Sequence, residues 1–174
     1  IIPPVLNYLG EQPNSFDPAV IQKGADQLQL LRPSITQFHS SEYINALANG
    51  DACLAVGWSG DIFQAATRAE EAGKGVEIAY VIPKEGAPMW FDMMAIPKDA
   101  KHPNNAHLFI NFIMRPEIAA EISNYVAYAS ANKAALANID AELKANPGVY
   151  PTEEAKKGLF SLAVLPPDVD RLFN

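Results

Sequence analysis

The chain has 174 residues, which is enough for one domain or for two small lobes and too few for a third. Hydrophobic residues make up 49% and charged residues 19%, so a hydrophobic core can form, and collagen, coiled coils and low-complexity arrays are excluded. The net charge is −7, and an acidic chain repels polyphosphates and attracts cations, so we expect no nucleic acid partner.

The single cysteine, Cys53, excludes an internal disulfide and a cysteine-based zinc site. No stretch approaches the roughly 18 consecutive apolar residues of a membrane span, so the sequence predicts a chain that does not cross a membrane. The first four residues, Ile1 to Pro4, include neither a starting Met nor the basic region of a signal peptide. We therefore expect a processed or truncated piece of a longer protein.

Proline punctuates the sequence and separates short apolar runs from segments with helical spacing, which predicts alternating helices and strands. At the first helix, Asp17 is a typical N-cap, Pro18 suits the first helical position, and Pro33 ends the repeat. Strands separated by helices imply an α/β architecture with a largely parallel sheet, although four strands make a small sheet. In chain order we expect helices over 18–32, 41–49, 60–73, 104–114, 116–125, 133–144 and 152–160, strands over 34–38, 52–58, 76–82 and 89–96, a turn at 146–148 and an irregular tail around 166–167.

The segment 57–61 lies where a predicted apolar strand ends and a predicted helix begins, which is where open α/β sheets bind their ligands. Asp61 falls in the first helical turn, where the helix dipole stabilises a carboxylate, so it could serve the helix end alone. Trp58 stands at the strand end, where a bulky indole has fewer core neighbours than in mid-strand. The pair therefore favours a ligand site, with a core tryptophan and a helix-stabilising aspartate as the alternative.

The predicted strand 89–96 holds the second unusual group. Because side chains alternate along a strand, Trp90 and Asp92 point to the same face. A buried carboxylate is costly unless something pairs with it, yet no Lys or Arg lies between Glu85 and Pro97. The partner is then a distant basic residue or a bound cation. Two tryptophans and two aspartates arranged in this way resemble an aromatic box with acidic ends, a site that suits a flexible alkylammonium.

Other signals for chemistry are weak. Residues 57–61 come close to the nucleophile elbow of α/β hydrolases, but Asp61 stands where that motif needs glycine. A hydrolase with Ser59 as nucleophile would need a nearby base, and we interpret the three histidines, His39, His102 and His107, as ordinary. Phosphate-binding, dinucleotide and metal-ligand spacings are missing. We expect no catalytic residue, no metal and no cofactor.

Five short segments carry a specific resemblance: 38–41 (FHSS), 57–61 (GWSGD), 82–86 (IPKEG), 90–92 (WFD) and 111–117 (NFIMRPE). Together they resemble the periplasmic polyamine-binding proteins that feed ABC importers. The resemblance runs along nearly the whole chain but covers only about the C-terminal half of such a protein. It implies a type II clam-shell of two α/β lobes with mixed, mostly parallel sheets, of which this chain is a part. One lobe would hold residues 15–89 and 134–174, and the other 90–133.

The same resemblance implies a binding protein and not an enzyme, located in the periplasm, with a membrane permease and the N-terminal half of the same protein as partners. Asp61 resembles the putrescine-binding members and Trp90 the spermidine-binding ones, so either ligand is expected. The alternative is the same fold binding an amino acid or a sugar, with Asp92 paired internally. The implied ligand contacts are Trp58 and Trp90 around the methylene chain, Asp61 and Asp92 on the ammonium groups, and Tyr128 and Ser40 as a wall and a hydrogen bond.

Overall fold

The computed structural model describes residues 1–172, which divide into two compact units built from separate stretches of the chain. The lobe boundaries implied by the resemblance concern a longer protein and stay a prediction. Of the described residues, unit 1 comprises Ile1–Phe38, Ile82–Phe91 and 152–172, and unit 2 comprises His39–Val81 and Asp92–Pro151.

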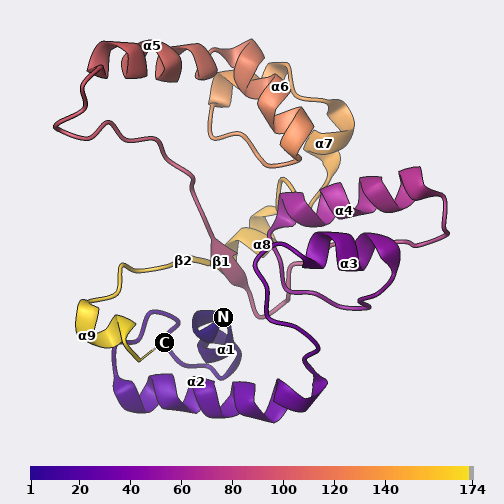
Figure 1. Ribbon diagram of the computed structural model, residues 1–174, viewed down its shortest axis with the longest axis vertical. Helices are drawn as coiled ribbons and strands as arrows, with labels where there is room; N and C mark the ends of the chain where they lie inside the picture. Colours follow the sequence, from indigo (N-terminus) through magenta and orange to yellow (C-terminus); the bar gives the residue numbers. More distant parts are fainter. Residues whose placement is uncertain (173–174) are drawn as a thin grey trace. The chain divides into compact units, whose positions relative to one another are not determined.

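Unit 1 is built around two helices that pack on each other, seen in indigo and violet in Figure 1. As expected, Asp17 caps the second helix, because its carboxylate accepts the Ala19 N–H at 2.8 Å. Leu6 is fully buried against Gly24, where a Cβ would lie only 3.1 Å from the leucine Cδ2. The elements of unit 1 are α1 (Ile2–Tyr8), α2 (Pro18–Leu31), η1 (Arg32–Ser34), β1 (Ala87–Met89), α8 (Glu153–Lys157), β2 (Leu159–Ser161) and α9 (Pro167–Asp170).

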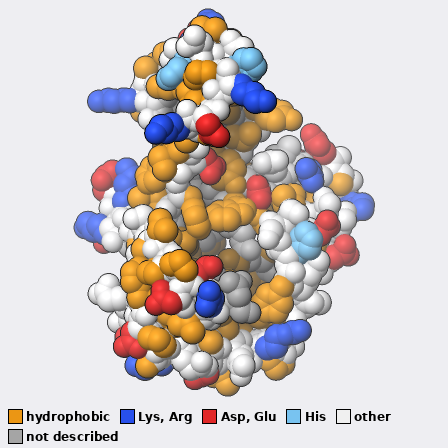
Figure 2. Space-filling model, turned by 60° about the vertical axis from the view of Figure 1, so that its left-hand side comes forward, with side chains coloured by type: hydrophobic (Ala, Val, Ile, Leu, Met, Phe, Trp, Pro, Cys, Tyr) orange, Lys and Arg blue, Asp and Glu red, His pale blue; other side chains and the backbone are white. Residues whose placement is uncertain are grey.

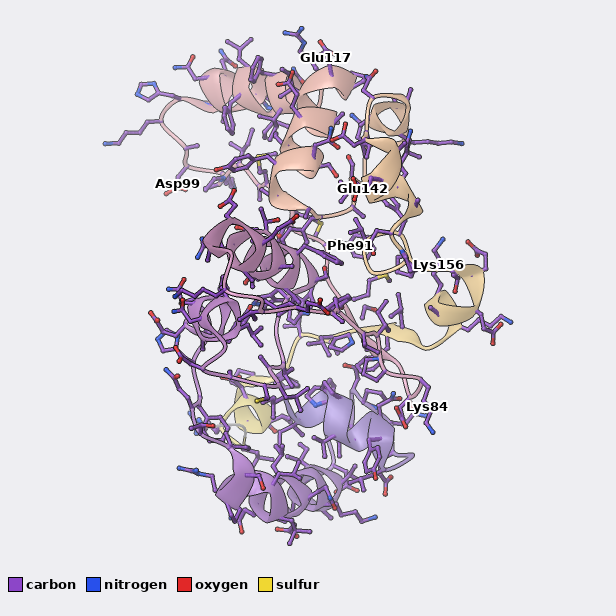
Figure 3. The ribbon with its side chains drawn as sticks, turned by 90° about the vertical axis from the view of Figure 1, so that its right-hand side faces the viewer. Lys84, Phe91, Asp99, Glu117, Glu142 and Lys156 are labelled. Atoms are coloured by element: carbon purple, nitrogen blue, oxygen red, sulfur yellow. The ribbon has the colours of Figure 1, made fainter. Side chains whose placement is uncertain are left out.

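The two short strands of unit 1, β1 and β2, pair in parallel, with Pro88 opposite Phe160. Asn14 holds β2 in place by donating to the Ser161 carbonyl and by accepting the Ala163 N–H, both at 2.9 Å. The turn before β1 carries Lys84, whose side chain points outward (Figure 3). The chain thus returns to its first helices through a small parallel ladder.

Unit 2 contains two separate cores. Helices α3 and α4 lie side by side (Figure 1) and enclose Leu47, Ile62 and Ala65. The second core, with Ala120 and Ala135, joins α6 to η2. The elements of unit 2 are α3 (Tyr43–Asn49), α4 (Ser59–Ala72), α5 (Pro103–Ile113), α6 (Pro116–Val126), η2 (Lys133–Ala137) and α7 (Ala141–Ala145).

The first five predicted helices are present as α2 to α6, and the later prediction needs correction. The helix expected over 133–144 is split into η2 and α7, because the Asp140 N–H donates to the Asn124 side chain at 3.1 Å instead of continuing the helix. The helix expected over 152–160 ends at Lys157, because the backbone beyond Gly158 pairs with β1. The sequence also gave no signal for α1, and the tail expected to be irregular includes α9.

The strand prediction was mostly wrong for the described residues. Within residues 1–172 the only ladder is β1 with β2, so the segments 52–58 and 76–82 run without strand partners. The same holds for 34–38, which begins in η1, and for 89–96, of which only Met89 pairs. A strand needs a neighbour to satisfy its backbone groups, and an apolar run alone does not supply one.

Apolar side chains on these extended segments are correspondingly exposed. Leu54 is 89% exposed, Val81 74% and Met93 88%, and hydrophobic side chains reach the surface over much of the face in Figure 2. Phe91, labelled in Figure 3, is also exposed at the end of the unit 1 stretch that follows β1. Among the helices of residues 1–172, none combines the length and the apolar character that crossing a bilayer would require.

Candidate functional site

The clearest candidate site lies in unit 2, at the start of α4. Trp58 is the N-cap residue of this helix and has an extended backbone, and Asp61 stands in the first turn. The helix therefore begins where the sequence predicted, although the preceding segment is extended and unpaired. A carboxylate in this position is stabilised by the positive end of the helix dipole.

The Asp61 carboxylate is held by two tyrosines from different helical regions. Tyr43, the first residue of α3, donates its hydroxyl to Asp61 Oδ2 at 2.6 Å. Tyr128, which follows α6, donates to Asp61 Oδ1 at 3.3 Å. The Ser123 hydroxyl donates to the Tyr128 carbonyl and ties that residue to the end of α6. Both oxygens of the carboxylate therefore accept a hydrogen bond from within unit 2.

The two phenols remain protonated donors over the physiological range. Burial, reinforced by the hydrogen bond to Asp61, raises the pKa of Tyr43 to about 12. Burial and the negative charge of Asp61 likewise raise the pKa of Tyr128 to about 12. Ionising either ring would place a second negative charge beside the carboxylate, which both the burial and the charge oppose.

Two glycines make room for these rings. A Cβ on Gly57 would overlap the edge of the Tyr43 ring, and a Cβ on Gly60 would overlap the Tyr128 ring. Gly60 is buried at the start of α4, where alanine would otherwise favour the helix by up to about 1 kcal/mol. Ring packing against Asp61 therefore explains the glycines on either side of Trp58 and Ser59.

The structure brings together some of the predicted site residues. Asp61 and Tyr128 are hydrogen-bonded, and the backbone N–H of Trp58 donates to the Tyr43 hydroxyl at 3.2 Å. The Trp58 side chain is 44% exposed. Ser40 is exposed on the segment that leads into α3.

Trp90 and Asp92 stand on either side of the boundary between the units, so the structure describes them separately. Trp90 is 54% exposed in unit 1. The expectation that Asp92 lies in a buried strand was wrong for this structure, because the residue is exposed on an extended segment without a ladder. Burial therefore gives Asp92 no need for a cationic partner in this structure.

Within unit 2, no basic side chain forms an ion pair with Asp61 or Asp92. The alternative function, binding of an amino acid or a sugar, would require such a pair at Asp92. Residues 1–172 also contain no group of three or more His, Cys, Asp and Glu side chains that could hold a metal ion. His39 Nδ1 accepts the N–H groups of Ser41 at 3.1 Å and Glu42 at 3.0 Å, so this ring stabilises the turn before α3.

Sequence reasoning missed Tyr43, which it assigned to the apolar face of a helix. The ring does contact the α3–α4 core, but its hydroxyl reaches the candidate site. A buried tyrosine usually finds a partner for its hydroxyl. No pattern in the sequence indicates that this partner is Asp61, which is 18 residues away.

Similarity to known proteins shows the family of the chain. Residues 6–152 match the model of the bacterial extracellular solute-binding protein family. The chain belongs to this family. It is 50% identical over 169 residues to the putrescine-binding periplasmic protein PotF of Escherichia coli (strain K12), covering 97% of this chain and 46% of that protein. It is 46% identical over 171 residues to the putrescine-binding periplasmic protein SpuD of Pseudomonas aeruginosa (strain UCBPP-PA14), covering 98% of this chain and 47% of SpuD.

A solved structure gives the same result for the fold. The spermidine/putrescine ABC transporter substrate-binding protein PotD of Streptococcus pneumoniae superposes with a TM-score of 0.74 at 31% identity, over 99% of this chain and 54% of that one. The fold class and the resemblance to polyamine-binding proteins are therefore confirmed, and the family is one of binding proteins, not enzymes. This member of the solute-binding family spans about half the length of the relatives it matches.

Proposed function

We propose that the whole protein is the periplasmic polyamine-binding component of an ABC importer, with putrescine or spermidine as its ligand. The observation that carries this proposal is the Asp61 carboxylate, which two hydroxyl groups hold in place and which no basic side chain of unit 2 neutralises. The names of the relatives, which include putrescine-binding and spermidine/putrescine-binding periplasmic proteins, support the same ligand class.

The chemistry of the six predicted residues suits a flexible diamine or triamine. Asp61 and Asp92 would bind ammonium groups, and charge-assisted hydrogen bonds of this kind contribute about 1.5–3 kcal/mol each. Trp58 and Trp90 would flank the methylene chain, where a cation over an indole face contributes about 0.5–2 kcal/mol. Tyr128 would form a wall and Ser40 would add a hydrogen bond. The carboxylates would therefore set the affinity, and the rings would set the shape of the ligand.

Calorimetric titration of the whole protein with a panel of solutes tests this function. We expect saturable binding of putrescine, spermidine or both, and no binding of a neutral amino acid or of glucose at the same concentrations. The reason is that a carboxylate without an internal counter-ion favours a cation over a neutral or zwitterionic solute. Binding of the sugar or the amino acid without binding of either polyamine would contradict the proposal.

The partners of this chain within the whole protein are also a proposal. We infer that the extended apolar segments of unit 2, with Leu54, Val56 and Val81, pair with strands from the remainder of the protein, whose relatives are about twice as long. The helix α5 supports this inference, because Leu108 and Phe109 on it are 69% and 59% exposed. In the whole protein, one lobe would contain residues 15–89 and 134–174 and the other lobe residues 90–133. The N-terminal half of the protein would complete both lobes. A membrane permease would then receive the protein with its ligand bound.

Co-expression of this chain with the separately encoded remainder tests that inference. We expect the two pieces to copurify as a one-to-one complex, because together they bury apolar surface that each alone exposes. A variant with Leu54→Asp and Val56→Asp should lower the yield of complex. Leu30→Asp should not lower it, although Leu30 on α2 is also exposed, at 73%. Independent behaviour of the two pieces, or equal loss with both variants, would contradict it.

A further inference from the structure

The Tyr43 hydroxyl forms hydrogen bonds with two parts of the site, the backbone of Trp58 and the carboxylate of Asp61. It lies 3.2 Å from the Trp58 backbone nitrogen and 2.6 Å from Asp61 Oδ2. An amide N–H can only donate, so the hydroxyl accepts from Trp58 and must give its single hydrogen to the carboxylate. The direction of both hydrogen bonds is therefore fixed by chemistry.

We propose that Tyr43 is a positioning residue that fastens the Asp61 carboxylate to the backbone of Trp58, so that the acid and the indole approach an ammonium ligand as one rigid unit. This inference rests on the proposed function and deepens it. Tyr43 itself is not required to touch the ligand. Its effect on binding is transmitted through Asp61.

The number of acceptor positions on the carboxylate supports this assignment. An ionised carboxylate offers about four lone-pair positions, two on each oxygen. Tyr43 occupies one on Oδ2 and Tyr128 occupies one on Oδ1, which leaves about two for the donors of a ligand. Neutral donors fix the orientation of the carboxylate without cancelling its charge, whereas a lysine or arginine in the same place would cancel it.

Gly57 provides independent support, because it is the residue that lets the Tyr43 ring reach this position. A Cβ on Gly57 would overlap Tyr43 Cε2 and would lie 2.8 Å from Cζ, the carbon that bears the hydroxyl. A side chain there would displace the ring and with it the hydrogen bond to Asp61. Gly57 and Tyr43 therefore position Asp61 together, and neither residue is required to contact the ligand.

The test is a double-mutant cycle in the whole protein, with putrescine or spermidine as the probe and calorimetry as the measurement. Tyr43→Phe keeps the ring and removes only the hydroxyl, and we expect it to weaken polyamine binding roughly three- to tenfold. In an Asp61→Asn background the same change should alter affinity less than about twofold, because the group through which Tyr43 acts is gone. Gly57→Ala should reproduce the Tyr43→Phe loss.

Tyr125→Phe is the matched control, because it removes a hydroxyl from a ring that is 87% exposed on α6 and should leave affinity unchanged. A second readout is amide hydrogen exchange at Trp58, which should become faster in Tyr43→Phe because its acceptor is lost. If Tyr43→Phe weakens binding equally in the unmodified protein and in the Asp61→Asn background, the positioning role is overturned. Unchanged affinity in Tyr43→Phe would also overturn it. If the unmodified protein binds neither polyamine, the proposed function fails first, so the two failures are distinguishable.

Discussion

Replacing Asp92 with asparagine in the whole protein should weaken binding of putrescine or spermidine at least tenfold, with a hundredfold loss at the upper end. The substitution keeps the shape of the side chain and removes the charge that would face an ammonium group. A charge-assisted hydrogen bond contributes about 1.5–3 kcal/mol, and each 1.4 kcal/mol corresponds to a factor of ten in affinity. Calorimetric titration of the variant and of the unmodified protein measures the difference directly.

Asp99→Asn is the matched control for this prediction. Asp99, labelled in Figure 3, is also exposed and follows Asp92 by seven residues in unit 2, so its loss changes the net charge equally. We expect its affinity to stay within about twofold of the unmodified protein, since an exposed charge at a distance is screened by salt. Equal losses in both variants would mean that net charge alone attracts the cation. An unchanged affinity in Asp92→Asn would refute its assigned role.

Replacing Gly86 with alanine should lower the free energy of unfolding of unit 1 more than replacing Gly10 with alanine. Gly86 has a φ of +105°, a conformation that side chains rarely adopt, and a Cβ there would overlap the carbonyl oxygen of Gly158. Gly86 immediately precedes β1 and Gly158 immediately precedes β2, so neither backbone can move without disturbing the parallel pair. We expect a loss of at least about 2 kcal/mol in the free energy of unfolding.

Gly10→Ala separates the two causes of that loss. Gly10 also has a positive φ, +76°, but a Cβ there meets nothing within 4 Å. Its substitution should therefore cost only the backbone strain, about 1 kcal/mol. Denaturant unfolding of both variants measures the difference. If the two variants lose the same stability, the close approach of Gly86 and Gly158 does not contribute.

Five helices, α2 to α6, could be predicted because their signals are local. Asp17 before Pro18 and the spacing of apolar residues determine the first turn and buried face of α2 without reference to any other element. Strands depend on a neighbour, and the apolar runs at 52–58 and 76–82 find none within the described residues. The sequence therefore showed which segments are extended and apolar, but not which of them pair.

The candidate site was predictable only in part. Asp61 could be recognised because an apolar run followed by the first turn of a helix is visible in the sequence, even though that run is not a strand in this structure. Tyr43 could not, because its function depends on how α3 packs against α4 and on the space that Gly57 leaves. Asp92 was recognised for a reason that this structure does not support, since the burial expected from a strand is not found.

A crystal structure of the whole protein with putrescine or spermidine bound tests the central claim most directly. The account predicts one ligand nitrogen within about 2.7–3.2 Å of an Asp61 oxygen. A second ligand nitrogen should lie equally close to Asp92, and the Tyr43 hydroxyl should still bridge Asp61 and the Trp58 N–H. Ligand nitrogens bound by other acids, with Asp61 or Asp92 paired to a lysine or arginine of the same protein, would contradict it.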